Sequence, residues 1–301
     1  MRAHSISSHG ILLSIAAMGF IALMDMTNKL ILIGTPLVMA LWSRYMIQAL
    51  AMTGLMLSKE GLNLFHTRAF KLQVLRAFLL LSCSFLGFKS LEQVPVAEFT
   101  AIAMVTPLLV TILARIFMKE HVTPMRWVLV ALGLMGALLI VRPGGDITPQ
   151  AALYPLGMAI SYALFQTLTS HMTKTEDPMK MHLFTGCIGA LVISFWVSQE
   201  WSTQFDSHYW WLMLLAGSAG TTGHFLLILA FQSTKASLIT PFLYSSIAFA
   251  TLFGWLVFTH VPDSTACMGI ALIVLCGVAS AWISLQKSQP LPHSSAGVSE
   301  N

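Results

Sequence analysis

Long apolar stretches, separated by short polar breaks, run along almost the whole chain. A helix rises 1.5 Å per residue, so about 20 residues cross the hydrocarbon core of a bilayer. Most of the stretches approach that length, and turn residues such as Gly34-Thr35-Pro36 separate them. The pattern predicts an all-α integral membrane protein with ten transmembrane helices at residues 11–33, 36–57, 72–91, 95–118, 125–141, 151–170, 180–198, 209–231, 236–258 and 264–284.

The two halves of this pattern repeat one another. The segment PLVMALWSRYMIQAL from Pro36 matches PMKMHLFTGCIGAL from Pro178 at an offset of 142 residues, and KEHVTP from Lys119 matches FTHVPD from Phe258 at an offset of 139. Because five predicted helices per half is an odd number, the second half must enter the membrane upside down. Inverted repeats are typical of secondary transporters, which alternate access about a site near the bilayer midplane.

Short loops and ends complete the predicted organisation. We expect a cytoplasmic N-terminus at 1–10, five-helix repeats at 11–142 and 150–285, and a disordered cytoplasmic tail at 286–301, which is rich in Pro and Ser. Most of the 16 Lys and Arg residues, Arg76 among them, then lie on the cytoplasmic side. That bias is typical of cytoplasmic loops, so we predict a multi-pass protein of the inner membrane with both termini in the cytoplasm.

Composition supports the membrane location and argues against other classes of protein. Hydrophobic residues make up 56% of the chain and charged residues 9%, with a mean hydropathy of +0.77, whereas soluble domains carry about 25% charged residues. The basic residues are scattered among short loops, which argues against nucleic-acid binding. The four cysteines form no CxxC pair, and the chain carries no catalytic or nucleotide-binding motif. We therefore expect no metal, no cofactor and no enzymatic activity.

Two long segments resemble a known transporter family. The first is VPVAEFTAIAMVTPLLVTILARIFMKEHVT from Val94, and the second is HFLLILAFQSTKASLITPFLYSSIAFATLFGWLVFTHVPD from His224. Both resemble the EamA-type repeat of the drug/metabolite transporter superfamily, and the resemblance covers about residues 10 to 285. It implies a ten-helix carrier whose third, fourth, eighth and ninth helices line a central cavity, with help from the first and sixth. The phrases MDMTNK, VAEFTAI and ITPFLY are similar to those of bacterial riboflavin and S-adenosylmethionine carriers.

Three charged residues fall inside predicted spans. A charge at the bilayer centre costs about 2.5–3.5 kcal/mol on insertion scales, so each one needs a partner or water. Asp25 and Lys29 are four residues apart and share a helical face, which allows an ion pair. Arg44 always carries its charge, and Asp25 on an adjacent helix is its candidate partner. These residues form either a structural charge network or a surface that contacts cargo.

Glu98 is the strongest single candidate for a functional role. It follows Pro95 in the first turn of a predicted span, where exposed backbone amides stabilise a carboxylate. Such a group attracts a cationic cargo or carries a proton. The alternative is an ordinary acid that faces solvent at the membrane surface.

Other polar and proline residues in the spans extend the candidate site. Aromatic rings stack on flat heterocycles and polar tips read hydrogen-bonding edges, although most such residues only bond a neighbouring helix. On this reasoning the candidate substrate-binding residues, besides Glu98, are Tyr162, Gln166, His224 and Tyr244. Pro107 and Pro241 each bend a helix and free a backbone carbonyl, so they are candidate hinges.

The combined reading predicts a secondary transporter. It would move a small organic metabolite across the cytoplasmic membrane by alternating access, with a riboflavin-like or S-adenosylmethionine-like solute as the leading candidate. An exporter of an amino-acid-like metabolite or metallophore, or a channel-like facilitator, remains the alternative. The expected partners are a small-molecule substrate, the lipid bilayer and a second copy in a homodimer.

Overall fold

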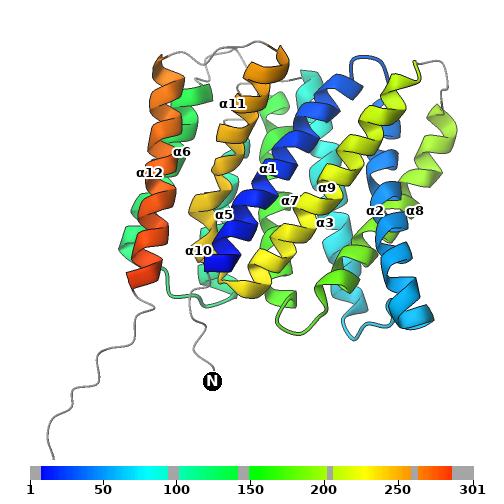
Figure 1. Ribbon diagram of the computed structural model, residues 1–301, viewed down its shortest axis with the longest axis horizontal. Coiled ribbons are helices and arrows are strands. Elements are labelled where there is room, and N and C mark those ends of the chain that lie inside the picture. The colour runs from blue at the N-terminus through cyan, green and yellow to red at the C-terminus, as the bar shows by residue number, and fades with distance from the viewer. Residues whose placement is uncertain (1–7, 94–101, 142–148, 202–205, 259–263, 287–301) are drawn as a thin grey trace, which may run out of the picture.

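The described part of the chain is built of helices and contains no β-strand (Figure 1). The computed structural model describes residues 8–93, 102–141, 149–201, 206–258 and 264–286. Its helices agree with the described parts of the predicted spans, with two exceptions. The fourth span is described only from residue 102, with α5 beginning at Thr106, and the ninth span divides at Tyr244 into two helices. The elements are α1 (Ser8–Ile31), α2 (Leu37–Glu60), the 3-10 helix η1 (Gly61–Phe65), α3 (Phe70–Gln93), α5 (Thr106–Phe117), α6 (Pro124–Val141), α7 (Pro149–Met172), α8 (Pro178–Glu200), α9 (His208–Ser233), α10 (Ala236–Leu243), α11 (Ser245–Phe258) and α12 (Ser264–Gln286).

The apolar composition of the helices suits a membrane. Among the described residues, five helical stretches are long and apolar enough to cross a bilayer: His9–Ile31, Phe70–Ser90, Pro178–Ser198, His208–Ser233 and Ala236–Val257. Large apolar side chains also cover the outer surface, where Phe195 is 76% exposed and Trp211 is 73% exposed. A protein surface of this kind is favourable in contact with lipid and unfavourable in contact with water.

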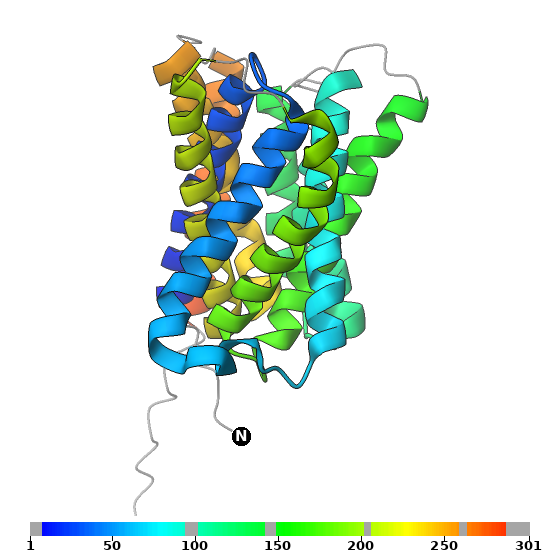
Figure 2. The same ribbon diagram turned by 90° about the vertical axis from the view of Figure 1, so that its right-hand side faces the viewer.

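Three helices of the first half each pack along a helix of the second half. Near one end of α2, Trp42 Nε1 donates to Ser194 Oγ of α8 at 3.0 Å, and near its other end Glu60 pairs with Lys180 at 3.0 Å. The contacts therefore run antiparallel along α2 and α8, which lie side by side in Figure 2. In the same way α1 packs along α9 while α3 packs along α7. The first helix of each half thus packs along the third helix of the other half, which is the arrangement expected for an inverted repeat.

Helix α9 lies between α1 and α2 and contacts both (Figure 1). Glycines make this close approach possible, because they leave no side chain in the contact. A Cβ atom added at Gly220 would lie 2.7 Å from Met24 Sδ of α1 and 3.6 Å from Arg44 Nε of α2. Helix α9, the eighth predicted span, therefore connects α1 to α2.

The two candidate hinge prolines lie beside breaks in their helices. Pro107 is in the first turn of α5, directly after a turn at residues 104–105, and Pro241 precedes the break at Tyr244. The Thr111 hydroxyl donates to the Pro107 carbonyl oxygen at 2.9 Å and lies 3.0 Å from the Thr240 hydroxyl. The contact joins α5 to α10, so both breaks lie in one packed region.

Candidate functional site: a polar cluster around Arg44

Arg44 joins three helices near the middle of the bundle. Its side chain is buried, 6% exposed, although it carries a permanent charge. Nη1 donates to Ser84 Oγ of α3 at 3.0 Å, and Nη2 lies 2.8 Å from His224 Nε2 of α9. Because arginine has donors and no acceptor, His224 Nε2 must accept this bond. The His224 ring is therefore neutral, with its proton on Nδ1.

Ser84 fixes the orientation of the Arg44 guanidinium. Its hydroxyl donates to the Leu80 carbonyl oxygen at 2.9 Å, one turn earlier on α3. The Ser84 oxygen is then available as an acceptor for Arg44 and for the Tyr45 hydroxyl, which lies 3.1 Å away. The serine thus uses its single donor on its own helix and orients two residues of α2.

Aromatic rings surround His224. The rings of Tyr162 and Phe165 on α7 meet the His224 ring edge to face, at centroid distances of 6.3 and 6.1 Å. Tyr162 and Phe165 are themselves nearly parallel, with an interplanar angle of 10°. This arrangement holds the imidazole in place and provides flat apolar surfaces beside its unpaired nitrogen.

Four buried polar atoms in this region have no hydrogen-bond partner among the described residues. Native proteins satisfy most buried polar groups, because leaving one unpaired costs about 1–3 kcal/mol. Unpaired groups gathered in one place mark a candidate binding site. In this cluster they come from α2, α7 and α9 and comprise Arg44 Nε, Gln166 Oε1, Thr221 Oγ1 and His224 Nδ1.

Asp25 is exposed and yet faces the interior of the bundle. It shares a helical face with Ser14, Met18 and Ile21, which are all buried. Lipid-exposed residues of α1 such as Leu12 lie on the opposite side of the helix. At Asp25 the inner face of α1 is therefore not covered by another described helix.

The sequence suggested that Asp25 and Arg44 lie on adjacent helices, but α9 packs between α1 and α2. An ion pair between the two residues stays a prediction. Lys29 is also exposed, one turn further along α1. The predicted charge network thus lies next to the polar cluster, and its role stays a prediction.

The structure does not bring Tyr244 into this cluster. Tyr244 is fully buried and packs with Val130 of α6, Ile247 of α11 and Ile273 of α12. Glu98 and the tail at 287–301 lie outside the described residues. Of the predicted binding residues that are described, Tyr162, Gln166 and His224 come together, and Tyr244 lies apart.

Sequence reasoning missed several polar residues of the interior. Arg76 was assigned to the basic residues of the cytoplasmic side, but its side chain is 0% exposed within α3. The spacing of the buried residues Gln73, Arg76, Leu80 and Ser84 follows one face of a helix and was the available signal. A count of charges cannot distinguish a loop arginine from one buried a few residues further along.

Known proteins that resemble this chain in sequence are transporters, and a known crystal structure shares its fold. A riboflavin transporter of Brucella anthropi is 28% identical over 246 residues, which cover 80% of this chain and 86% of that protein. An S-adenosylmethionine uptake transporter of Rickettsia conorii is 27% identical over 218 residues, covering 71% and 72% of the two chains. A crystal structure with 15% identity superimposes with a TM-score of 0.80, covers 94% of this chain and 99% of that one, and shows the fold alone.

A sequence profile matches both halves of the chain separately. The profile is that of the EamA-like transporter family, and it matches residues 8–142 and again residues 150–281. Together the two matches cover most of the 301 residues, with one family domain in each of the antiparallel halves. The chain therefore belongs to the EamA-like transporter family and is a multi-pass protein of the inner membrane.

Proposed function

We propose that this protein is a secondary transporter that moves a small organic metabolite across the inner membrane by alternating access. The observation that carries the proposal is the polar cluster around Arg44, which draws on helices of both halves and leaves buried polar atoms unpaired. Family membership and the names of the relatives support the same conclusion. The ten predicted spans and the rocking of two halves belong to this proposal.

The chemistry of the cluster suits a flat solute with a hydrogen-bonding edge. Arg44 Nε and His224 Nδ1 offer donors, and Gln166 Oε1 offers an acceptor. The Tyr162 ring provides a stacking surface and the exposed Asp25 carboxylate attracts a cationic group. A riboflavin-like or S-adenosylmethionine-like solute carries features of this kind. This substrate class is the one that we propose.

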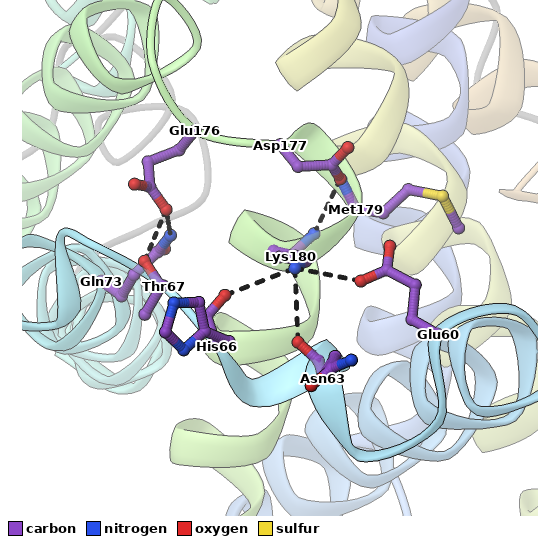
Figure 3. Close-up of polar contacts among 9 residues, drawn as sticks. All are labelled: Glu60, Asn63, His66, Thr67, Gln73, Glu176, Asp177, Met179 and Lys180. Atoms are coloured by element: carbon purple, nitrogen blue, oxygen red, sulfur yellow. Dashed lines mark hydrogen bonds and ion pairs between the residues drawn. The ribbon is translucent and has the colours of Figure 1, made fainter.

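The two ends of the bundle differ in a way that supports alternating access. At the end that carries η1, Lys180 pairs with Glu60 at 3.0 Å and donates to the carbonyl oxygens of Asn63 at 3.3 Å and His66 at 3.4 Å (Figure 3). Glu176 accepts from Thr67 and from Gln73 at the same end. These contacts tie the first half to the second, and we call them the η1-end network.

The exposed inner face of α1 lies away from this network. Asp25 belongs to the C-terminal part of α1, which ends at Ile31. That end of α1 lies at the top of the bundle in Figure 1, and the C-terminal end of α2, which leads into η1, lies at the bottom. We propose that the structure is the state that is closed at the η1 end and open at the other. Transport would then require the η1-end network to separate.

Uptake into proteoliposomes tests this function. Purified protein should give saturable uptake of labelled riboflavin or S-adenosylmethionine, and unlabelled solute inside the vesicles should accelerate it. Arg44→Lys should reduce uptake at least about tenfold, because a lysine cannot contact Ser84 and His224 in the same fork geometry. Arg68→Lys, an exposed arginine, is the matched control.

Two outcomes would each contradict a different part of this proposal. Flux that rises linearly with solute concentration and shows no acceleration by internal solute would contradict a carrier. Saturable uptake that is identical in Arg44→Lys and the parent protein would remove the cluster around Arg44 from the binding site.

A further inference from the structure

Helix α10 is a short, buried segment between two breaks in the chain. All eight of its residues are buried, and it packs against α1, α5, α6 and α12, which belong to both halves. It ends at the break at Tyr244, and it begins after Lys235 at the η1 end of the bundle (Figure 1). Most backbone polar groups of so short a helix lie in its terminal turns, so they need partners from outside the helix. The position of α10 therefore depends on the contacts at its two ends.

A carboxylate from the other half caps the first turn of α10. Glu120 Oε2 accepts a hydrogen bond from the backbone N–H of Ser237 at 3.1 Å, although 117 residues separate the two in the chain. The usual capping position does not supply this bond, because Lys235 makes no side-chain capping contact. A carboxylate at a helix N-terminus satisfies a free amide and also interacts favourably with the helix dipole. Glu120 thus takes the place of a local cap and ties α10 to the first family domain.

The C-terminal turn of α5 places Glu120 beside α10. Two backbone N–H groups donate to the Ala114 carbonyl oxygen, that of Met118 at 3.1 Å and that of Glu120 at 3.2 Å. Lys119 between them has a φ of 52°, in the left-handed region that residues with a side chain rarely adopt. This combination is a Schellman motif, in which glycine is the usual left-handed residue. The chain therefore adopts an unfavourable backbone conformation at Lys119, and that conformation orients Glu120 toward the amide of Ser237.

The capping acid occurs in one half of the sequence only. At the repeat offset of 139 residues, Glu120 corresponds to Thr259, which carries no charge and lies outside the described residues. An exact repeat would supply equivalent acids to both halves, and these would favour neither opening of the bundle. An interaction made in one state and lost in the other shifts the equilibrium toward the first state. Glu120 therefore favours the state in which it contacts α10.

We propose that Glu120 is a positioning residue for transport, which latches α10 to α5 in the state that is closed at the η1 end. Opening of that end separates Glu120 from Ser237 and lets α10 turn about the break at Tyr244. This Glu120 latch rests on the proposed alternating access. It is separate from the η1-end network, which lies on α2, η1, α3 and the start of α8.

Cysteine labelling of the full-length protein in detergent measures the two openings without any cargo. In a background without the four native cysteines, Ser170→Cys reports the opening at the η1 end, because Ser170 is 2% exposed and lies one turn beyond Gln166 toward that end of α7. Asp25→Cys reports the opposite opening. Glu120→Ala should raise the rate at which a water-soluble thiol reagent labels Ser170→Cys about fivefold, as expected for loss of one helix cap, and should lower the rate for Asp25→Cys.

Two further variants separate the Glu120 latch from an effect on folding. Glu120→Gln keeps an oxygen that accepts from Ser237 but loses the charge, so it should accelerate labelling of Ser170→Cys only about twofold. Asp177→Ala removes a carboxylate that caps α8 from within its own half, through two amides of the first turn. It should lower the Tm without changing the ratio of the two labelling rates.

Two results would overturn the Glu120 latch. The first is a ratio of labelling rates in folded Glu120→Ala that equals that of the parent background; if Glu120→Ala does not fold, an unchanged ratio in Glu120→Gln has the same meaning. The second is an equal change of this ratio in Asp177→Ala, which would show that weakening any helix start opens the η1 end. A changed ratio in a protein that takes up no solute would instead contradict the proposed function and leave the latch standing.

Discussion

Arg44 of α2 and His224 of α9 meet through a 2.8 Å contact although 180 residues separate them in the chain. The contact joins the first family domain to the second at the centre of the bundle. It also determines the proton position on the imidazole, because Arg44 can only donate. His224 can therefore donate through Nδ1, which has no hydrogen-bond partner among the described residues.

Two substitutions at His224 should separate its two roles. His224→Gln places an amide near the position of Nε2, so it can still accept from Arg44, and the protein should remain close to wild type in Tm. His224→Asn places an amide near Nδ1 but leaves Arg44 without this acceptor. We expect His224→Asn to lower stability by about 1–3 kcal/mol. His224→Gln should instead raise the KM for uptake about tenfold, through loss of the Nδ1 donor.

Thermal unfolding and uptake kinetics, measured on the same preparations, check this pair. Equal losses of stability in both variants would contradict the assigned tautomer. A wild-type KM in His224→Gln would show that Nδ1 does not contact cargo.

Asp25 should be accessible to water from one side of the membrane. In a background without the four cysteines, Asp25→Cys should react with a membrane-impermeant thiol reagent added outside cells, because Asp25 is exposed on the inner face of α1. Leu12→Cys on the lipid face should stay unlabelled. Labelling is read by mass spectrometry, and reaction only from the cytoplasmic side would reverse the orientation that we propose.

The Glu60–Lys180 pair should influence conformation more than stability. The side chains are 38% and 19% exposed, and ion pairs at such positions contribute about 0–1 kcal/mol. Glu60→Gln should therefore change the free energy of unfolding by less than about 1 kcal/mol. By weakening the η1-end network it should favour the opposite opening and slow the external labelling of Asp25→Cys.

Exposed Asp177 on the neighbouring turn offers a comparison site. Asp177→Asn keeps a side-chain oxygen that accepts from the amides of Met179 and Lys180, and it should leave labelling unchanged. Unaltered labelling in Glu60→Gln as well would show that the pair does not bias the two states.

Gly186 of α8 should tolerate no side chain. A Cβ atom there would lie 2.9 Å from the backbone nitrogen of Ala49 of α2, so Gly186→Ala must push α8 away from α2. We expect a loss of about 1–3 kcal/mol in unfolding free energy, as for other overpacked contacts. Gly54→Ala is the matched control, since nothing lies within 4 Å of its added Cβ, and alanine there should stabilise α2 by about 0.5–1 kcal/mol. Equal Tm changes in the two variants would contradict the close packing.

Long-range contacts account for most of what sequence reasoning missed. Tyr162, Gln166 and His224 were identified as candidates because polar groups inside spans need partners, and they do come together. Tyr244 satisfied the same criterion and packs elsewhere, with α6 and α12. Ser84 has no unusual sequence context, and its importance arises only because Arg44 and Tyr45 reach it from another helix.

The amino-acid sequence by itself determined the helices, their approximate ends, the doubled organisation and the family. These properties follow from local causes, since apolar runs of sufficient length form helices in lipid, and Gly and Pro end them. Only the tertiary structure decided that α9 separates α1 from α2, that Arg44 meets His224, and that Arg76 is buried with no ion-pair partner among the described residues. Those relationships depend on which helix faces pack together, and small residues such as Gly220 decide that packing through space across the whole chain.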